Sequence, residues 1–144
     1  MYETEAVRRL VGRYCDAVLR FDPDAFGAAW AEDAVWHIPG GKDVHGRAAI
    51  VSTYAELRAL YAMCVQEILG SLIEPAGRGR FTVRELQWRA EGEGSQLIGV
   101  YDDTFSGPAD APLFASRRFT LLYRGPVDLS GRLYGPSRLR APES

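Results

Sequence analysis

The sequence predicts an α+β domain in which three N-terminal helices pack on a curved mixed or antiparallel sheet. Apolar residues recur at the three-and-four spacing of helices from residue 4 to residue 61, and the pattern then changes to strands separated by glycine-containing turns. Helices in one run followed by strands in another are typical of this class, with the helices covering one face of the sheet. A sheet curved into a half-open, cone-shaped α+β barrel would leave an apolar pocket between helices and strands.

Each of the three predicted helices has a recognisable start. The first covers residues 4–19, because its apolar residues form a single stripe and Thr4 can cap it. Asp22 followed by Pro23 marks the start of the second helix, with the aspartate as N-cap and the proline at the first helical position. The third begins after Gly46, where apolar residues again repeat at helical spacing.

Strand patterns account for the predicted sheet. The first strand covers residues 34–38, and Glu32 and Asp33 just before it are expected at the end of the second helix and the entry to the strand. The later strands are separated by turns and by a loop with two prolines. These strands are predicted at residues 64–73, 81–90, 97–106 and 114–123, with turns at residues 76–79 and 91–94.

Length and composition bound the class of protein. The chain has 144 residues, which suits one domain that folds without disulfides or metals, and we place that domain at residues 1–125 with a tail at 126–144. An apolar fraction of 47% with 11% aromatic residues can line a cavity as well as fill a core. The formal net charge of −2 offers no basic footprint for nucleic acid, and no cysteine or histidine spacing predicts a metal site.

Cysteines and hydropathy predict the location. Cys15 and Cys64 are expected to be buried reduced thiols, which favours the cytoplasm. Charged residues are spread through positions 1–20, so no apolar signal core is present, and no stretch of 18 apolar residues could span a membrane. We therefore expect a cytoplasmic protein without a membrane segment.

Six short motifs follow one another between residues 6 and 125. They are Arg13-Tyr14, Asp22-Pro23-Asp24-Ala25-Phe26, Ala31-Glu32-Asp33-Ala34-Val35-Trp36, His45-Gly46-Arg47, Gly99-Val100-Tyr101-Asp102-Asp103 and Arg117-Arg118-Phe119. In order and spacing they resemble the SnoaL-like branch of the nuclear transport factor 2-like superfamily, which includes ketosteroid isomerases, scytalone dehydratase and polyketide cyclases. The resemblance implies a cofactor-independent enzyme with a pocket for a hydrophobic substrate.

The catalytic residues that this resemblance implies are only partly present. Dehydratase and dehydrochlorinase members use an aspartate near the end of the first helix with a histidine on the first long strand, and these positions hold Leu19 and Gln66. Of the set used by ketosteroid isomerases, Tyr14 is retained, whereas the base falls on Ile38 and the late-strand acid on Tyr101. The resemblance therefore implies that the two tyrosines act as hydrogen-bond donors to a carbonyl oxygen.

Strand alternation selects a candidate base, because successive residues of a strand point to opposite faces. Tyr101, Asp103 and Phe105 share one face, and Arg117 and Phe119 share one face of the neighbouring strand. If those faces coincide, Asp103 meets Arg117. Asp103 is then either a general base in the pocket or the structural partner of a buried arginine that supports Tyr101.

The same alternation predicts an outer face. If Trp36 and Ile38 face the helices, His37 faces away, where it is expected at a surface or an interface. Because helices cover only one side of the sheet, its other side, including Val35 and His37, is open to a second copy. We expect a homodimer through this outer face, as members of the family commonly form.

The sequence thus predicts an acid–base isomerase, dehydratase or cyclase, without cofactor or metal, for a hydrophobic polycyclic, polyketide or terpenoid-like small molecule. The alternative is a binding or structural domain of the same fold without chemistry, which Leu19, Ile38 and Gln66 at catalytic positions favour. A carboxylate with a raised pKa in the cavity would favour the enzyme. Predicted catalytic residues are Tyr14, Tyr101 and Asp103, and predicted pocket residues are Leu19, Trp36, Ile38, Gln66, Phe105, Arg117 and Phe119.

Overall fold

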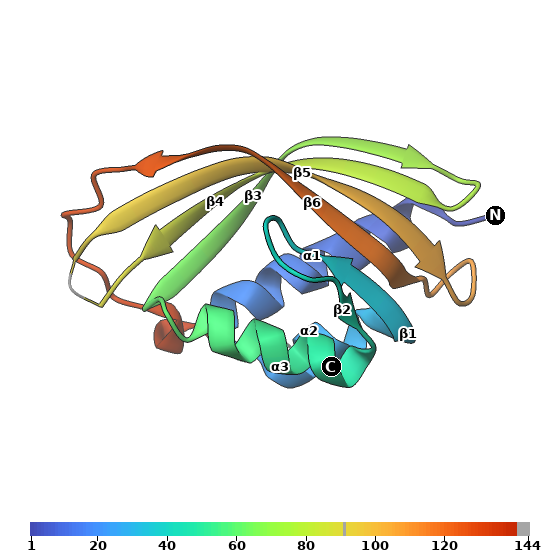
Figure 1. The fold of residues 1–144 in the computed structure, drawn as a ribbon, viewed down its shortest axis with the longest axis horizontal. Coiled ribbons are helices and arrows are strands. Elements are labelled where there is room, and N and C mark those ends of the chain that lie inside the picture. The colour runs from blue at the N-terminus through green and yellow to red at the C-terminus, as the bar shows by residue number, and fades with distance from the viewer. Residues whose placement is uncertain (91, 141–144) are drawn as a thin grey trace.

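Six strands form one mixed sheet that arches over three helices (Figure 1). The computed structural model describes residues 1–90 and 92–140. The strand order is β2-β1-β6-β5-β4-β3, so the sheet is open, with β2 and β3 at its edges. The elements are α1 Thr4–Arg20, α2 Pro23–Ala28, β1 Trp30–His37, β2 Val44–His45, α3 Arg47–Arg58, β3 Met63–Glu74, β4 Arg78–Trp88, β5 Gly94–Ser106, β6 Leu113–Pro126 and a short 3-10 helix, Pro136–Arg138.

The three predicted helices are confirmed, and their starts differ in detail. The N-cap of α1 is Glu3, without a side-chain cap, so the prediction that Thr4 caps the helix is wrong: Thr4 is already its first residue. Asp22 does cap α2, since its side chain accepts a hydrogen bond from the Ala25 amide at 3.1 Å. Before α3 the backbone of Gly46 has φ +89°, a conformation that glycine adopts without strain.

The four late strands are confirmed as an antiparallel meander from β3 to β6, each longer than predicted. The predicted turn at residues 91–94 includes residue 91, which lies outside the described residues. β2 was not expected, because two residues are too few for a strand pattern to be visible.

β1 starts four residues earlier than predicted, at Trp30, so Glu32 and Asp33 belong to a strand and not to the end of a helix. The cause is long-range: β1 runs parallel to β6, with Trp30 opposite Phe114, and the Phe114 amide donates to the Ala29 carbonyl at 2.9 Å. Strand pairing thus overrides the local helical preference of this segment.

Aromatic side chains fill the space between the helices and the first half of the sheet. Trp30, Phe26 and Phe114 are fully buried, and Tyr14 packs against all three with ring centroids 4.9–6.2 Å apart. The rings of Phe26 and Tyr54 stack at 3.9 Å and join α2 to α3. This dense cluster closes one end of the space under the sheet.

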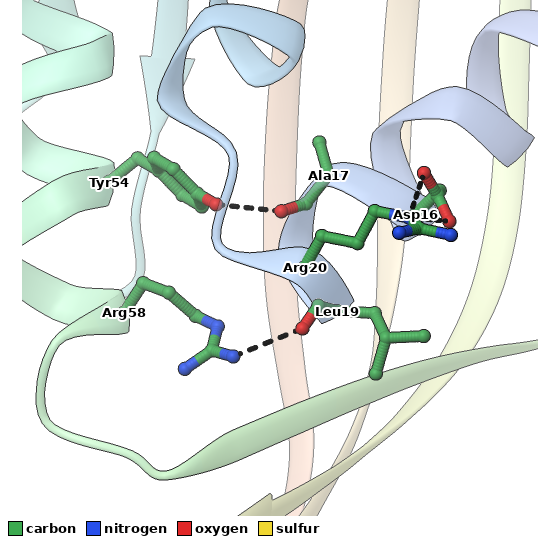
Figure 2. Close-up of polar contacts among 6 residues, drawn as sticks. All are labelled: Asp16, Ala17, Leu19, Arg20, Tyr54 and Arg58. Carbon is green, nitrogen blue, oxygen red and sulfur yellow. Dashed lines mark hydrogen bonds and ion pairs between the residues drawn. The ribbon is translucent and has the colours of Figure 1, made fainter. Parts of the chain in front are cut away.

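Two side chains of α3 bind the C-terminal end of α1 (Figure 2). The Tyr54 hydroxyl donates to the Ala17 carbonyl at 2.8 Å, and the buried Arg58 guanidinium donates to the carbonyls of Val18 and Leu19 at 2.7 and 3.2 Å. The last carbonyls of a helix lack partners further along it, and a cation is favoured at this end. The Ala17 carbonyl also accepts hydrogen bonds from the Phe21 and Asp22 amides. The contacts hold α3 against the C-terminal end of α1.

Candidate functional site

A cavity of about 330 Å³ lies between the helices and the inner face of the sheet. Most of its wall is apolar or aromatic, as in small-molecule sites in general. The polar groups in the wall come from four strands and from helices α1 and α3. The lining residues are Tyr14, Val18, Phe26, Trp36, Ile38, Pro39, Tyr54, Leu57, Arg58, Leu60, Tyr61, Cys64, Gln66, Val83, Glu85, Gln87, Leu97, Tyr101, Phe119, Leu121 and Arg124.

The carboxyl group in the cavity wall is that of Glu85 on β4. Gln66 donates from Nε2 to its Oε1 at 2.9 Å, and Gln87 donates from Nε2 to its Oε2 at 2.6 Å. Burial raises the pKa of Glu85, while the two amide hydrogen bonds oppose the rise. The carboxyl group is therefore fixed in position, keeps lone pairs for a further proton and has the raised pKa expected of an acid–base group.

A second layer of contacts fixes both amides. The Cys15 thiol donates to Gln66 Oε1 at 3.8 Å, and the Ser95 hydroxyl donates to Gln87 Oε1 at 2.8 Å. Since each amide oxygen is occupied by a donor, each amide NH₂ is directed at Glu85. The glutamines are thereby oriented to stabilise the ionised carboxylate.

Tyr14 and Tyr101 place their hydroxyls 3.4 Å apart in the cavity wall. Burial raises the pKa of both phenols, so both are protonated at neutral pH. When one hydroxyl donates to the other, the second keeps its hydrogen for another acceptor. The pair can therefore donate a hydrogen bond to an oxygen of a bound molecule.

Beneath the tyrosines, Arg117 and Asp103 form an ion pair of 2.8 Å between Nε and Oδ1. They meet as strand alternation predicts, and both side chains are almost fully buried. The guanidinium stacks 3.7 Å from the Tyr101 ring centre and 4.4 Å from that of Tyr14. Burial raises the pKa of Asp103 and Arg117 opposes the rise; its Oδ2 has no hydrogen-bond partner in the described chain.

Only some of the residues predicted for the site meet in the cavity wall. Tyr14, Trp36, Ile38, Gln66, Tyr101 and Phe119 line it. Asp103 and Arg117 lie behind this wall. Phe105 packs in the core against Tyr2 and Phe114. Leu19 is partly buried and, as Figure 2 shows, its side chain points away from Tyr54 and Arg58.

Sequence reasoning missed Glu85 and Gln87, although a pattern that reveals them exists. Every second residue of β4 lies on one face of the strand, and the first two of this set are apolar and buried. The set is Phe81, Val83, Glu85 and Gln87. Extending that inner face by period two places the glutamate and glutamine in the pocket. Neither residue belongs to any of the six motifs on which the family resemblance rests.

His37 has Nδ1 2.8 Å from Asp43 Oδ1 and does not line the cavity. Across residues 1–90 and 92–140, no group of three or more histidine, cysteine, aspartate or glutamate side chains is placed to hold a metal ion.

Within the same ranges, none of the helices combines the length and apolar character needed to cross a bilayer.

Solved structures similar to this one share its fold. A hexachlorocyclohexane dehydrochlorinase, LinA type 2, is 18% identical with a TM-score of 0.75, and 94% of each chain is covered. A candidate scytalone dehydratase from Novosphingobium aromaticivorans is 18% identical with a TM-score of 0.76, over 95% of this chain and 94% of the other. LinA-type3 from Novosphingobium barchaimii is 16% identical with a TM-score of 0.75, over 85% and 88%.

Sequence comparison gives the family. A search among curated proteins finds no match. The SnoaL-like domain, a family of the nuclear transport factor 2-like superfamily, matches residues 11–109, which include residues 11–20 of α1, the first strand and the inner-face residues of β4 and β5 up to Phe105. The match spans more than half of the chain and agrees with the fold. This protein belongs to the SnoaL-like domain family.

Proposed function

We propose that this protein is an acid–base enzyme, an isomerase, dehydratase or cyclase, for a small and largely apolar carbonyl compound. The observation that carries the proposal is the Glu85 carboxyl group, held between two amides in the wall of an apolar cavity. Buried carboxyl groups with raised pKa values and defined partners are typical of catalytic acids and bases. The cavity volume of about 330 Å³ suits a ligand of a few rings.

In this proposal Glu85 takes a proton from carbon, and the tyrosine pair receives the charge that develops on oxygen. The amides of Gln66 and Gln87 hold the carboxylate in its ionised form before the transfer. The free hydroxyl hydrogen of Tyr14 or Tyr101 then donates to the enolate oxygen. Arg117, stacked on both rings, favours negative charge at the phenols and makes them better donors.

The base has moved to a neighbouring strand in this proposal. Gln66 occupies the position where dehydratases of the family carry a histidine, and Glu85 is its direct partner across β3 and β4. Two of the similar structures are named as a dehydrochlorinase and a dehydratase. Both names describe elimination reactions, in which a base removes a proton from carbon. We propose the same kind of step, removal of a proton from carbon, for this protein, with Glu85 as the base.

Proton transfer by Glu85 can be measured without knowing the natural substrate. In 5-nitrobenzisoxazole, a base removes the proton on carbon 3, the N–O bond breaks and the coloured 2-cyano-4-nitrophenolate is released. We expect saturable catalysis by the natural protein and a loss of about 10²- to 10⁴-fold in Glu85→Gln, the usual contribution of a general base. The matched control is Glu67→Gln, an exposed residue of β3 that pairs with Arg84 on the outer face.

Equal rates in Glu85→Gln and the natural protein would contradict the proposal.

The second candidate function is a binding domain without chemistry. It is favoured by Leu19 and Gln66, which stand where dehydratases of the family carry their catalytic aspartate and histidine. A protein that binds the benzisoxazole with no rate above buffer, and equally well in both forms, would be such a domain.

A further inference from the structure

A β-bulge in β6 changes which side chains face the cavity. Phe119 lies opposite Tyr101 and Leu121 opposite Gly99, but the next paired residue, Tyr123, lies opposite Ile98. One extra residue, Leu122, is thus inserted into β6, and bulges of this kind redirect the side chains that follow. Simple alternation from residues 117, 119 and 121 would turn position 124 outward.

The bulge places Arg124 on the inner face. Arg124 is the partner of Leu97 on β5, and both line the cavity. Its side chain is exposed, so it stands at the opening of the cavity and not in the core. The inward direction of this arginine is therefore built into the register of the sheet.

Arg124 also differs from the other cation in the cavity wall, because its guanidinium donors are not used within the described residues. Two cations line the cavity among the residues described, Arg58 and Arg124. The guanidinium of Arg58 donates to the main-chain carbonyls of Val18, Leu19 and Tyr61. For Arg124 no ion pair or side-chain hydrogen bond occurs within residues 1–90 and 92–140, and a guanidinium offers a planar fork of donors suited to a carboxylate.

The register also fixes how far this cation lies from the proposed base. Glu85 is the partner of Leu97 on one side, and Arg124 is its partner on the other, so the three residues form one row across β4, β5 and β6. Neighbouring strands are about 4.8 Å apart, which puts the backbones of Glu85 and Arg124 roughly 10 Å from each other. Leu97 between them provides an apolar surface.

We propose that Arg124 binds a carboxylate of the ligand, so that the cavity takes an apolar ring compound carrying one carboxylate at a ring's length from the reacting carbon. The choice of reacting carbon rests on the function proposed above; the binding of the carboxylate does not. The charged end lies at the opening against Arg124, and the ring lies over Leu97 with its far side toward Glu85. A reversed orientation would bring two carboxylates together at Glu85 and is disfavoured.

The test compares 2-naphthoate with neutral 2-naphthamide, measured by titration calorimetry on the natural protein, Arg124→Gln and Arg118→Gln. Arg118 is the matched control because it lies on the same strand, exposed, opposite Asp102 of the outer face. We expect the natural protein and Arg118→Gln to bind the carboxylate about fivefold or more tightly than the amide, and Arg124→Gln to lose this preference, as for a charge-assisted hydrogen bond.

Three results would overturn the inference: an unchanged preference in Arg124→Gln, an equal loss in Arg118→Gln, or no binding of 2-naphthoate by the natural protein. Glu85→Gln separates this inference from the proposed function. It removes the base and leaves Arg124 in place, so it should retain the carboxylate preference. If catalysis fails while the preference holds, only the reaction is refuted; if the preference fails while Glu85 still catalyses, only the ligand class is refuted.

Discussion

At the scale of single residues, the chemistry of the cavity depends on how Glu85 is held. Burial favours its neutral form, whereas the amides of Gln66 and Gln87 favour the carboxylate. The balance sets the pH at which the group changes from acid to base. Cys15 and Ser95 fix the amide directions, and the charges of Arg58 and Arg124 also lower the pKa of Glu85, so this balance depends on side chains from α1, α3 and four strands.

Removing one amide should raise the pKa of Glu85 further, since each hydrogen bond lowers it. In Gln66→Leu we expect the pH–rate profile for 5-nitrobenzisoxazole to shift to higher pH, with its inflection above that of the natural protein. Gln96→Leu, next to Leu97 but on the opposite face of β5, serves as the control. A shift to lower pH, or an equal shift in both variants, would show that Gln66 does not stabilise the ionised Glu85.

The raised pKa of Glu85 also makes a prediction for stability. Its folded-state pKa lies above the value of about 4.3 of an unfolded chain, so the folded state binds more protons between the two values, and stability falls as pH rises through that window. Relative to Glu85→Gln, the natural protein should therefore be most stable at acidic pH and lose that advantage at neutral pH. Urea unfolding of both proteins at several pH values measures this, and a difference independent of pH would contradict it.

The buried pair of Asp103 and Arg117 predicts a large effect on stability. Asp103→Asn leaves the buried guanidinium without a charged partner and should destabilise the fold by about 3–5 kcal/mol. Asp102→Asn breaks an exposed pair with Arg80 and should cost about 0–1 kcal/mol. Chemical unfolding of the two variants side by side checks this. Equal, small changes in the free energy of unfolding would mean that the pair of Asp103 and Arg117 does not stabilise the core beneath Tyr14 and Tyr101.

At the scale of elements, the contact between α1 and α3 holds the helical side of the cavity. Tyr54→Phe removes one hydrogen bond to Ala17, whose carbonyl still accepts from the Asp22 amide, and should cost about 1 kcal/mol. Arg58→Met leaves the carbonyls of Val18 and Leu19 without their charged donor and should cost about 2 kcal/mol or more. Thermal melts of both variants test this order; a reversed order would show that the arginine does not stabilise the helix end.

The elements also show how far local sequence patterns reach. Helices with an apolar stripe or an Asp-Pro start, and strands with clear alternation, were predictable because their causes are local. The early start of β1 at Trp30 was not, because its cause is the parallel pairing with β6. The bulge at Leu122 was not visible either, because a bulge is defined by the register of two strands and not by one sequence.

At the scale of the whole molecule, the site could be predicted in part for the same reason. The family resemblance pointed to Tyr14, Tyr101 and Gln66, all of which line the cavity. Helical spacing agreed with it for Tyr14, and strand alternation agreed with it for Tyr101. Asp103 has the right alternation, yet depth along β5 places it behind the wall, beside Arg117. Alternation predicts the face of a residue; how far along the strand the cavity extends depends on the packing of the helices.

Self-association is the remaining prediction for the whole molecule. Leu72 and Leu122 are 58% and 63% exposed, and the sheet has helices on one face only, so we expect a homodimer through its outer face. Light scattering after size-exclusion chromatography at micromolar concentration should give twice the mass of one chain, and Leu72→Glu should lower it. The mass of a single chain in the natural protein would contradict this expectation.

Whether Glu85 removes a proton from carbon inside the cavity is tested most directly by hydrogen–deuterium exchange of a bicyclic ketone, 2-tetralone. The protein is incubated with the ketone in D₂O, and the loss of the proton signals next to the carbonyl is followed by NMR. The account predicts exchange faster than in buffer, slowed in Tyr14→Phe and Tyr101→Phe and returned to the buffer rate in Glu85→Gln. Exchange that is equally fast in the natural protein and in Glu85→Gln would contradict it.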